Sequence, residues 1–405
     1  MTSSIAADLP SFPFRRPEPF GVPDRYDDLR SRQPVCPVRS ADGKRALLVT
    51  GYEDVRAVLM DSRVSTDKNH PGYPLQNRFF GVGKVADEKT FFDMDPPEHT
   101  RFRRMFAPDF SGKAVERMLG SIQAVVDDCL DGMIAAGPPQ DLVSSLSLAL
   151  PTRALATVLG VPHEDFDFLQ AKTTVLVSLR SGPEDAAAAS KDLLAYFLEL
   201  IGRKEAAPGQ DLISRVLREH VAAGELTKVQ LASSCRVLLV AGFETTASMI
   251  SLSTLALVTH PEQRDHFVAA DDAGAAAAVE ELLRYLAVAH VGRRRVAIED
   301  MEIGGQPVSA GEGLILATDA GDHDPRIVDD PGKLDLTRRR RKPIVAFGFG
   351  VHQCIGQSLA RAELRIALRT LLRRLPELRL AMPVEQLPFE QEAMAYGAKC
   401  LPVVW

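Results

Sequence analysis

One stretch of 33 residues, from Lys228 to His260, limits the possible folds of this chain more than any other feature. Its sequence, KVQLASSCRVLLVAGFETTASMISLSTLALVTH, is apolar on almost every side of a helix. Thr227 and Gln230 form a capping box at its start, and the pair His260-Pro261 ends it. At 1.5 Å per residue such a helix spans about 50 Å, the width of a domain. We therefore expect one long helix that crosses the core.

The middle of this helix contains residues that are unfavourable there. Gly242 lies in a helix interior, which costs about 1 kcal/mol relative to alanine. Glu244 places a carboxylate in apolar surroundings, which is costly unless it is paired or protonated. Thr245 and Thr246 can bond back to carbonyls one turn earlier. Either Gly242 allows close helix packing and Glu244 forms an internal salt bridge, or these residues have a chemical function.

The rest of the chain is predicted to be mainly α-helical with small β-sheets, in a single domain covering residues 1–405. Helical patterns dominate from Pro96 to about Tyr285 and return after Cys354, whereas strand patterns occur in separate patches. The remaining predictions are an irregular segment at 1–40, a strand at 44–50, a long loop at 66–93, short strands within 291–316, and a β-like tail from Leu387.

Composition excludes several classes of protein. The net charge of −6 argues against general nucleic-acid binding. The N-terminal residues have no apolar segment typical of a signal peptide, and no run of 18 apolar residues predicts a membrane span. The five cysteines are widely spaced without a CxxC pair, so we expect no disulfides and a cytoplasmic location.

A single cysteine lies in a glycine-rich turn just ahead of a predicted helix, in the stretch FGFGVHQCIG. A thiolate at Cys354 would be stabilised there by the helix dipole and by free backbone N–H groups. Gly348, Gly350 and Gly356 let a flat ligand approach the backbone, and Phe347 offers an aromatic face. One soft ligand beside a flat surface suits an axial thiolate on haem iron.

Other functions for this cysteine fit less well. No second cysteine or histidine lies at zinc-ligand spacing, and GFG is not the GxGxxG pattern of a dinucleotide site. His352 is too close in sequence to be a convincing general base for a nucleophilic Cys354. A loop cysteine without any function is the remaining alternative.

Four motifs in order give the chain its resemblance to a known family. They are DPPEHTRFR at 95–103, AGFETT at 241–246, ELLR at 281–284 and FGFGVHQCIG at 347–356. Over nearly its whole length the sequence resembles the cytochrome P450 superfamily, and more closely its soluble actinobacterial class. The resemblance implies a triangular α-rich body with a β-rich lobe, and heme b (iron protoporphyrin IX) as cofactor.

Several residue roles follow from this resemblance. Cys354 matches the proximal thiolate ligand of the iron, and the other cofactor-binding positions are His99, Arg103, Ala241, Arg295, Phe347, Gly348, His352 and Gly356. Among these, His99, Arg103, Arg295 and His352 match partners of the haem propionates. In the run Arg293 to Arg295, we expect only Arg295 to be buried and the other two to be solvated.

Glu244 and Thr245 match the catalytic acid–alcohol pair of the family, which delivers protons during oxygen activation. Gly242 would open the groove for dioxygen. The resemblance implies a structural ion pair between Glu281 and Arg284, with Arg338 as its third partner.

The implied reaction is monooxygenation of a hydrophobic small molecule by O2. The electrons would come from NAD(P)H through a ferredoxin reductase and a ferredoxin, and the enzyme is expected to be a monomer that binds neither nucleic acid nor membrane. A group of basic residues would either steer the acidic ferredoxin or simply keep helices soluble: Arg101, Arg104, Arg338 to Arg341, Lys342, Arg361 and Arg365. Two other functions stay open, a P450-type nitric oxide reductase and a non-enzymatic haem protein that binds gases or ligands.

The substrate itself is not predicted beyond its hydrophobic character. The pocket is expected to be lined by the 66–93 loop, Val240 and Ala241, Ala287 to Ala289, and Met394 to Tyr396. Phe79, Phe80, Phe91 and Phe92 would either line it or anchor the loop. The chain also departs from the family motif AANRDP, because Asp322 and His323 replace asparagine and arginine.

Overall fold

The computed structural model describes residues 9–16, 19–75, 89–178, 181–339, 341–391 and 393–405. They form two compact units. Unit 1 consists of Met1–Lys84, Phe91–Thr100 and Glu280–Cys354, and unit 2 consists of Val85–Thr90, Arg101–Val279 and Ile355–Trp405.

Unit 1 is built on a five-stranded sheet with the order β1-β2-β8-β5-β3, in which β2 and β8 are parallel and the other neighbours antiparallel. A separate hairpin pairs β6 with β7. The strands are β1 Val35–Arg39, β2 Arg45–Val49, β3 Val64–Ser65, β5 Arg293–Ala297, β6 Met301–Ile303, β7 Gln306–Val308 and β8 Gly313–Leu316.

Side chains along the central strands point alternately to the two sides of the sheet, and both sides are apolar. Leu47 and Val49 of β2 pack in the same cluster as Tyr52 of α2, whereas Ala46 and Leu48 pack on the opposite side. Helix α2 (Tyr52–Met60) therefore covers one face, while α1 (Arg25–Arg32) and α12 (Thr318–Asp322) cover the other.

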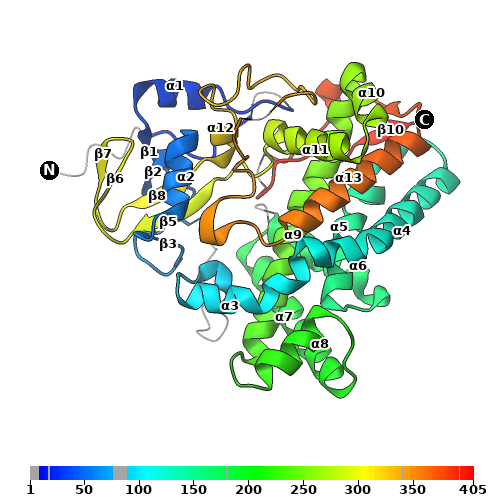
Figure 1. Ribbon diagram of the computed structural model, residues 1–405, viewed down its shortest axis with the longest axis horizontal. Helices are drawn as coiled ribbons and strands as arrows, with labels where there is room; N and C mark the ends of the chain where they lie inside the picture. Colours follow the sequence, from blue (N-terminus) through cyan, green and yellow to red (C-terminus); the bar gives the residue numbers. More distant parts are fainter. Residues whose placement is uncertain (1–8, 17–18, 76–88, 179–180, 340, 392) are drawn as a thin grey trace. The chain divides into compact units, whose positions relative to one another are not determined.

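Unit 2 is mostly helical, and Figure 1 shows α4 and α13 side by side within it. Its helices are α4 Gly112–Ala136, α5 Ala149–Leu159, α6 Phe166–Val177, α7 Pro183–Ala206, α8 Leu212–Val216, α9 Lys228–Thr259, α10 Pro261–Ala269 and α13 Gln357–Arg374. A three-stranded sheet has the order β4 (Gln140–Asp141), β10 (Pro402–Val404), β9 (Arg379–Leu380). Helices α3 (Glu98–Phe106) and α11 (Asp272–Leu286) contribute residues to both units.

Short helical turns connect these elements. The 3₁₀ helices are Phe91–Asp93, Ala107–Phe110, His163–Asp165, Gly350–His352 and Val384–Gln386, and π-helical turns occur at Val143–Ser147 and Leu217–Val221.

Helix α9 confirms the prediction of a long core helix. The side chain of Thr227 accepts a hydrogen bond from the backbone N–H of Gln230, and the Gln230 side chain completes the capping box. By length and composition alone α9 passes the test for a membrane span, with a mean hydropathy of 1.3. However, 67% of that apolar window is buried inside the protein. Such burial is what a core helix shows, because packing against neighbouring helices replaces contact with lipid.

The predicted fold class, mainly α with small β-sheets, is confirmed, and the strand expected at 44–50 is β2. The prediction that residues 1–40 are irregular is wrong, because α1 and β1 lie there. Within the predicted 66–93 loop, residues 76–88 lie outside the described part of the chain. The tail from Leu387 is only partly β, with β10 at its end.

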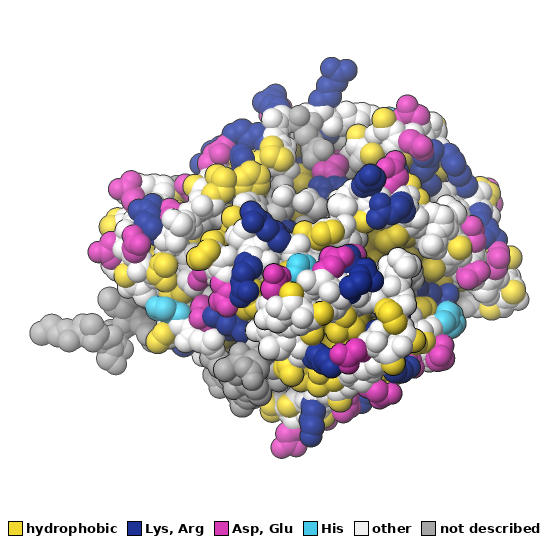
Figure 2. All heavy atoms as spheres, turned by 60° about the horizontal axis from the view of Figure 1, so that its bottom comes forward, with side chains coloured by type: hydrophobic (Ala, Val, Ile, Leu, Met, Phe, Trp, Pro, Cys, Tyr) yellow, Lys and Arg dark blue, Asp and Glu magenta, His cyan; other side chains and the backbone are white. Residues whose placement is uncertain are grey.

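The protein surface carries both signs of charge. On the face shown in Figure 2, the described basic and acidic side chains are interspersed with hydrophobic ones. None of the five cysteines, all within described segments, forms a disulfide. The free cysteines agree with the expectation drawn from their spacing.

Candidate active site

Cys354 belongs to unit 1 and follows the 3₁₀ turn Gly350–His352. Its backbone N–H donates a hydrogen bond to the carbonyl of Phe347, with an N···O distance of 2.9 Å. Gly356 is the N-cap of α13, so Cys354 lies just before a helix N-terminus, as predicted. Its side chain is partly exposed. The thiol therefore lies where the helix dipole favours a negative charge.

Glycine occurs at three positions around Cys354 for different structural reasons. A Cβ built on Gly350 would lie 2.7 Å from the carbonyl oxygen of Leu59, so only glycine fits against α2. Gly348 has a φ of +72°, and its Cβ would meet only Nε of Arg293, at 4.0 Å. A Cβ on Gly356 would meet nothing within 4 Å. The backbone at Gly348 and Gly356 consequently faces open space that a flat ligand can fill.

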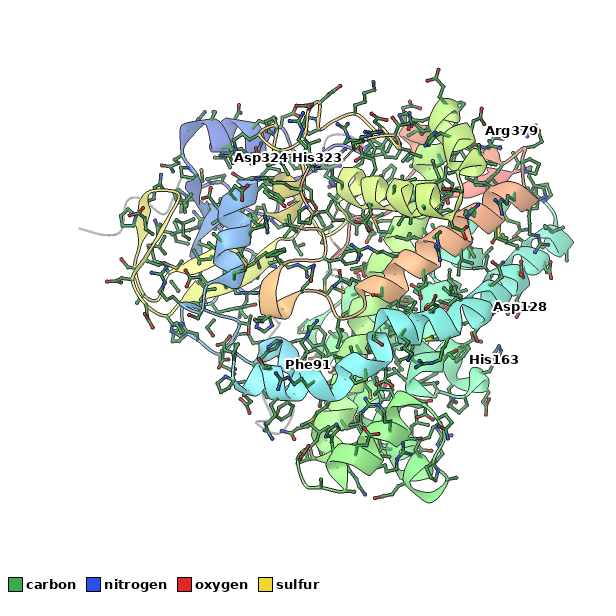
Figure 3. The ribbon with its side chains drawn as sticks, viewed as in Figure 1. Phe91, Asp128, His163, His323, Asp324 and Arg379 are labelled. Carbon is green, nitrogen blue, oxygen red and sulfur yellow. The ribbon has the colours of Figure 1, made fainter. Side chains whose placement is uncertain are left out.

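The structure brings together two of the predicted cofactor-binding histidines in unit 1. The rings of His99, on α3, and His352 have centroids 4.0 Å apart, and His99 is buried. Phe91 (Figure 3) stacks on Phe92 at 4.5 Å and lies 6.5 Å from His99. Phe91 is therefore part of the packing that holds His99. Arg103 lies one turn further along α3 and is partly buried.

Strand β5 buries more positive charge than we expected. Arg294 is only 6% exposed and Arg295 8%, so the prediction that Arg294 is solvated is wrong. Burial lowers the pKa of each of these two guanidinium groups to about 10. Arg295 donates to the carbonyl of Arg294 at 2.7 Å but forms no ion pair with a described carboxylate.

Neighbouring guanidinium nitrogens on β5 are also unsatisfied. Among the described residues, Nε of Arg293 and both Nε and Nη2 of Arg294 have no hydrogen-bond partner. A buried cation without a counter-charge is expensive. This strand therefore has the chemistry of an anion-binding site.

Sequence reasoning missed Arg293 as a neighbour of the thiol. The residue lies close enough to Cys354 for electrostatic interaction, although burial is the larger effect and lowers the pKa of Arg293. Nothing in the run of three arginines distinguishes it. Its position follows from the pairing of β5 with β8, which cannot be read from local sequence.

In unit 2, Glu244 shows the environment of a proton-carrying acid. Burial raises the pKa of its carboxyl group to about 8, and the nearby Glu390 adds to this rise. The carboxyl accepts a hydrogen bond from the backbone N–H of Ala395, while Oε2 has no partner among the described residues. No described cation pairs with Glu244, so the salt-bridge interpretation is wrong. Burial therefore favours the protonated form of this carboxyl group.

Glu244 lies on the only accessible side of the middle of α9. Ala241 is exposed, and Val240, Glu244 and Thr245 are partly exposed, whereas the residues from Thr246 to Leu257 are buried. The Thr245 hydroxyl donates to the carbonyl of Ala241 at 3.0 Å, as its position in the helix predicted. The acid and the alcohol thus face one open strip of the helix.

Gly242 has a packing role, and its role in a dioxygen groove stays a prediction. A Cβ at this position would lie 2.8 Å from Cδ1 of Leu155, so the missing side chain points toward α5. The interpretation that Gly242 allows close helix packing is therefore confirmed.

Two of the predicted pocket segments adjoin within unit 2. Ala395 donates to Glu244, and a Cβ on Gly397 would lie 2.5 Å from Oγ of Ser248, so the chain near 395–397 runs against α9. Tyr396 is buried in the same segment and stacks on Phe389 at 5.7 Å. The predicted residues Phe79 and Phe80 lie outside the described part of the chain.

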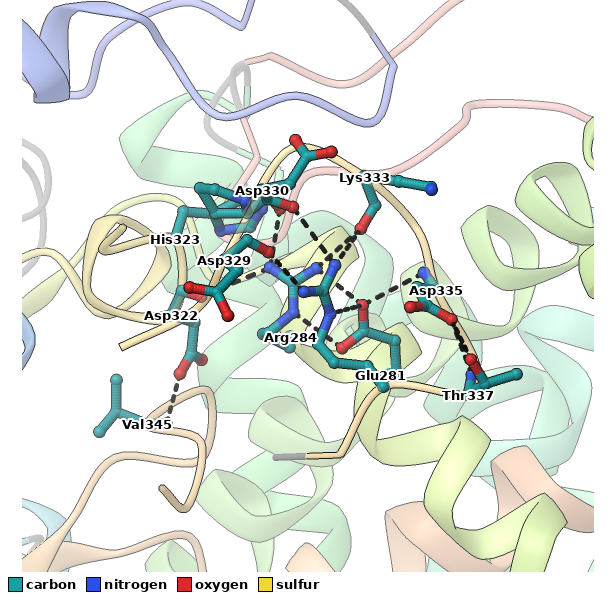
Figure 4. Close-up of polar contacts among 12 residues, drawn as sticks. Glu281, Arg284, Asp322, His323, Asp329, Asp330, Lys333, Asp335, Thr337 and Val345 are labelled. Carbon is teal, nitrogen blue, oxygen red and sulfur yellow. Dashed lines mark hydrogen bonds and ion pairs between the residues drawn. The ribbon is translucent and has the colours of Figure 1, made fainter. Parts of the chain in front are cut away.

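The predicted ion pair in unit 1 is confirmed (Figure 4). Arg284 donates to both carboxylate oxygens of Glu281, at 2.8 and 2.9 Å, and Arg338 adds a third bond at 3.0 Å. Glu281 and Arg284 are both buried. Arg284 also donates to the carbonyls of Pro331 and Lys333, which fixes the following loop. Such a network is structural because every strong donor is satisfied within the fold.

Comparison with known proteins agrees with this site. Residues 275–395 match the sequence profile of the Cytochrome P450 family. The chain is 44% identical over 384 residues to Cytochrome P450-SU2 of Streptomyces griseolus, covering 95% of this chain and 93% of that protein. It is 40% identical over 405 residues to the vitamin D3 dihydroxylase of the same organism, covering 100% and 99%.

Solved structures show the same fold. The crystal structure of CYP105P1 in complex with filipin I superposes with a TM-score of 0.91 at 38% identity, covering 98% of this chain and 99% of that one. Similarity of this extent covers both units and all four sequence motifs. The chain therefore belongs to the cytochrome P450 family of haem-dependent monooxygenases.

Proposed function

We propose that this enzyme inserts one oxygen atom of O2 into a hydrophobic small molecule, by hydroxylation or epoxidation, with Cys354 as the haem-iron ligand and Glu244 and Thr245 as the catalytic pair. The observation that carries the proposal is the Glu244 carboxyl group, whose Oε2 has no partner among the described residues, on the same strip of α9 as the Thr245 hydroxyl. An acid with a pKa of about 8 both gives and regains a proton near neutral pH.

The residues present fit haem. Its two propionates would supply the hydrogen-bond acceptors that the buried guanidinium nitrogens of Arg293 and Arg294 lack among the described residues. Within unit 1, Gly348 has no side chain that would obstruct a flat group beside Cys354. The residues that would hold the group are Cys354 through sulfur, His99, Arg103, Arg295 and His352 through the propionates, and Ala241, Phe347, Gly348 and Gly356 by contact. When bound, haem supplies the redox chemistry that activates O2.

The protein's own contribution is to hold and deliver protons. Glu244 carries its proton at an oxygen with no partner among the described residues, Oε2, while the Ala395 N–H orients the carboxyl group. Thr245 donates to the Ala241 carbonyl, so its oxygen lone pairs are free to accept a hydrogen bond on the open strip. We therefore assign the proton to the Glu244 carboxyl group and the role of hydrogen-bond acceptor to the Thr245 hydroxyl.

The electron donor is proposed to be a ferredoxin that receives electrons from NAD(P)H through its reductase. Arg101 and Arg104 are exposed on α3 and would attract an acidic partner. Arg338 does not belong to this surface, because its guanidinium is bound to Glu281. In unit 1, Val351 is exposed and lies three residues before Cys354, so it would supply an apolar contact to the ferredoxin.

A charge reversal tests this docking. Arg101→Glu with Arg104→Glu is expected to slow ferredoxin-supported reduction at low salt about tenfold. Reduction by dithionite should be unchanged. Equal rates with ferredoxin for the variant and the unmodified protein would show that these arginines serve solubility only.

The substrate is proposed to be a bulky apolar compound, such as a secondary metabolite, a steroid or terpenoid, or a xenobiotic. Support comes from the apolar segment at 394–396 against α9 and from relatives named for vitamin D3 or solved with filipin I. We also propose that residues 1–405 act as one cytochrome P450 domain, as a cytoplasmic monomer.

The absorption spectrum of the dithionite-reduced protein with carbon monoxide tests the central claim. A strongly red-shifted Soret band is expected for the unmodified protein and should be absent in Cys354→Ala. A panel of hydrophobic compounds added to the ferric form should reveal substrates as shifts in spin state. A band typical of histidine or neutral thiol ligation would overturn the assignment of Cys354. NADH consumption with nitric oxide and without ferredoxin would instead favour a nitric oxide reductase.

A further inference from the structure

The segment that carries Cys354 is held at its start by a side chain that departs from the family motif. Asp322 ends helix α12 and is 1% exposed. Its Oδ1 accepts a hydrogen bond from the backbone N–H of Val345 at 2.8 Å (Figure 4), and the carboxyl group also accepts from the N–H of Ala346. Val345 is completely buried. Asp322 is thus an acceptor for two consecutive N–H groups, the first of which belongs to a completely buried residue.

Hydrogen bonds continue from this anchor to the thiol. The N–H of Gly348 donates to the carbonyl of Val345 at 2.7 Å, and the N–H of Cys354 donates to that of Phe347 at 2.9 Å. Two further contacts of the segment come from α2 and β5: the Tyr52 hydroxyl donates to the carbonyl of Pro343 and Arg293 donates to the carbonyl of Ala346. Asp322 therefore binds N–H groups, whereas these two side chains bind carbonyls.

We propose that Asp322 is a positioning residue for Cys354: by accepting hydrogen bonds from the N–H groups of Val345 and Ala346, it fixes the start of the segment whose end presents the sulfur. This inference rests on the proposed function, because it takes Cys354 as the iron ligand. It assigns a role to a residue that the sequence marked only as a departure.

An aspartate differs from an asparagine at this position because it can ionise. Oδ2 of Asp322 has no hydrogen-bond partner among the described residues, and Arg284, the nearest cation, is already bound by Glu281. Burial raises the pKa of Asp322 to about 8. Three charged or titratable groups interact electrostatically with Asp322: Tyr52 on α2, Asp319 on α12 and Arg284 on α11. Asp322 also lines a cavity of about 250 Å³, and the other charged residues that line it are Arg284, Asp329, Asp335, Arg338, Arg339, Arg341 and Lys342.

The direction of the resulting pH effect follows from linkage. The folded pKa of Asp322 lies above its ordinary value of 3.8, so the protonated form favours the folded anchor. Its contribution is complete below about pH 4 and is lost as the pH rises through about 8. Asparagine makes the same hydrogen bonds through its carbonyl oxygen without this loss.

The test uses haem-loaded protein with three substitutions: Asp322→Ala, Asp322→Asn and, as matched control, Asp329→Asn. Asp329 lines the same cavity, but its side chain is 77% exposed. The measurements are the rate at which the thiolate-type carbon monoxide band is lost, the haem reduction potential, and hydrogen exchange of residues 343–350, at about pH 6 and about pH 8.5.

Asp322→Ala is expected to lose the carbon monoxide band at least about tenfold faster than Asp329→Asn. Its haem reduction potential should shift, and the backbone amide hydrogens of residues 345–346 should exchange faster. The advantage of Asp322→Asn over the unmodified protein in the lifetime of the band should grow about tenfold as the pH rises from about 6 to about 8.5. Because this second variant retains the hydrogen bonds, it keeps the test decisive even where Asp322→Ala does not fold.

Two results would overturn the inference. One is identical band loss, potential and exchange in Asp322→Ala and Asp329→Asn. The other is a lower melting temperature in Asp322→Ala with an unchanged band and potential, which marks a purely structural residue. Absence of the thiolate band in the unmodified protein is a different outcome, because it removes the proposed function as well.

Discussion

Gly242 on α9 and Leu155 on α5 are packed so closely that a methyl group at position 242 would lie 2.8 Å from Cδ1 of Leu155. Leu155 is buried and has little room to move. The glycine in the middle of the long helix is thus explained by the approach of a neighbouring helix. Close packing at this point also holds the adjacent accessible strip of α9 in place.

Gly242→Ala is expected to lower the free energy of unfolding. Overpacking costs about 1–3 kcal/mol, and the better helix propensity of alanine returns about 1 kcal/mol. Chemical denaturation measures the net loss, and adding Leu155→Ala should relieve part of it. The control is Gly120→Ala in α4, where a Cβ meets nothing within 4 Å and a gain of about 0.5–1 kcal/mol is expected. A Gly242→Ala variant as stable as this control would contradict the packing role.

Glu244→Gln is expected to reduce product formed per electron consumed by about 10²-fold, since glutamine cannot deliver a proton. The substitution should also change the pH dependence of stability. The folded pKa of Glu244, about 8, lies above the ordinary value of 4.5, so the stabilisation by the protonated form is lost as the pH rises through 8. The variant should therefore gain stability relative to the unmodified protein between about pH 5 and about pH 8.

The control for this substitution is Glu262→Gln, at an exposed position of α10. Product analysis with a spin-shifting substrate and denaturation at both pH values would measure the two effects. Unchanged product yield in Glu244→Gln would falsify the proton-carrying role.

Glu281→Gln is expected to destabilise the protein strongly, by about 3–5 kcal/mol, because it leaves the buried Arg284 and its neighbour Arg338 without their carboxylate. Glu53→Gln is the matched control, since Glu53 pairs with Lys342 at the surface, where a pair contributes about 0–1 kcal/mol. Thermal denaturation of both variants compares the two pairs. Equal losses would show that burial does not set the strength of the Glu281 network.

Arg295→Met is expected to have opposite effects with and without haem. In the haem-free protein it removes a buried charge that forms no ion pair with a described carboxylate, so stability should rise. In the loaded protein it removes a propionate partner, so haem should transfer to apomyoglobin about tenfold faster. Arg379→Met, exposed on β9, should change neither. Slower haem loss in Arg295→Met would exclude a role in binding the cofactor.

Sequence reasoning succeeded where partners are local or belong to a distinctive motif. Thr227 and Gln230 predicted the start of α9, because a capping box is complete within four residues. Glu281 and Arg284, three residues apart, gave the buried ion pair.

Tertiary features were not predictable in the same way. The burial of Arg294 depends on what packs around β5, and the direction in which Gly242 faces depends on α5, which is distant in sequence. The hydrogen bond between Asp322 and Val345 spans 23 residues and joins the end of α12 to a loop, an approach that no periodic sequence pattern predicts.

The accessible strip of α9 has a consequence for how this enzyme can change. Between Arg236 and Thr245 the helix has both accessible and buried positions. From Thr246 to Leu257 the side chains are buried. Evolution toward new substrates therefore has only a narrow set of adjustable positions on this helix, near Val237, Val240 and Ala241. A saturation library of α9 should show tolerance recurring every three to four residues and ending abruptly one turn after Ala241.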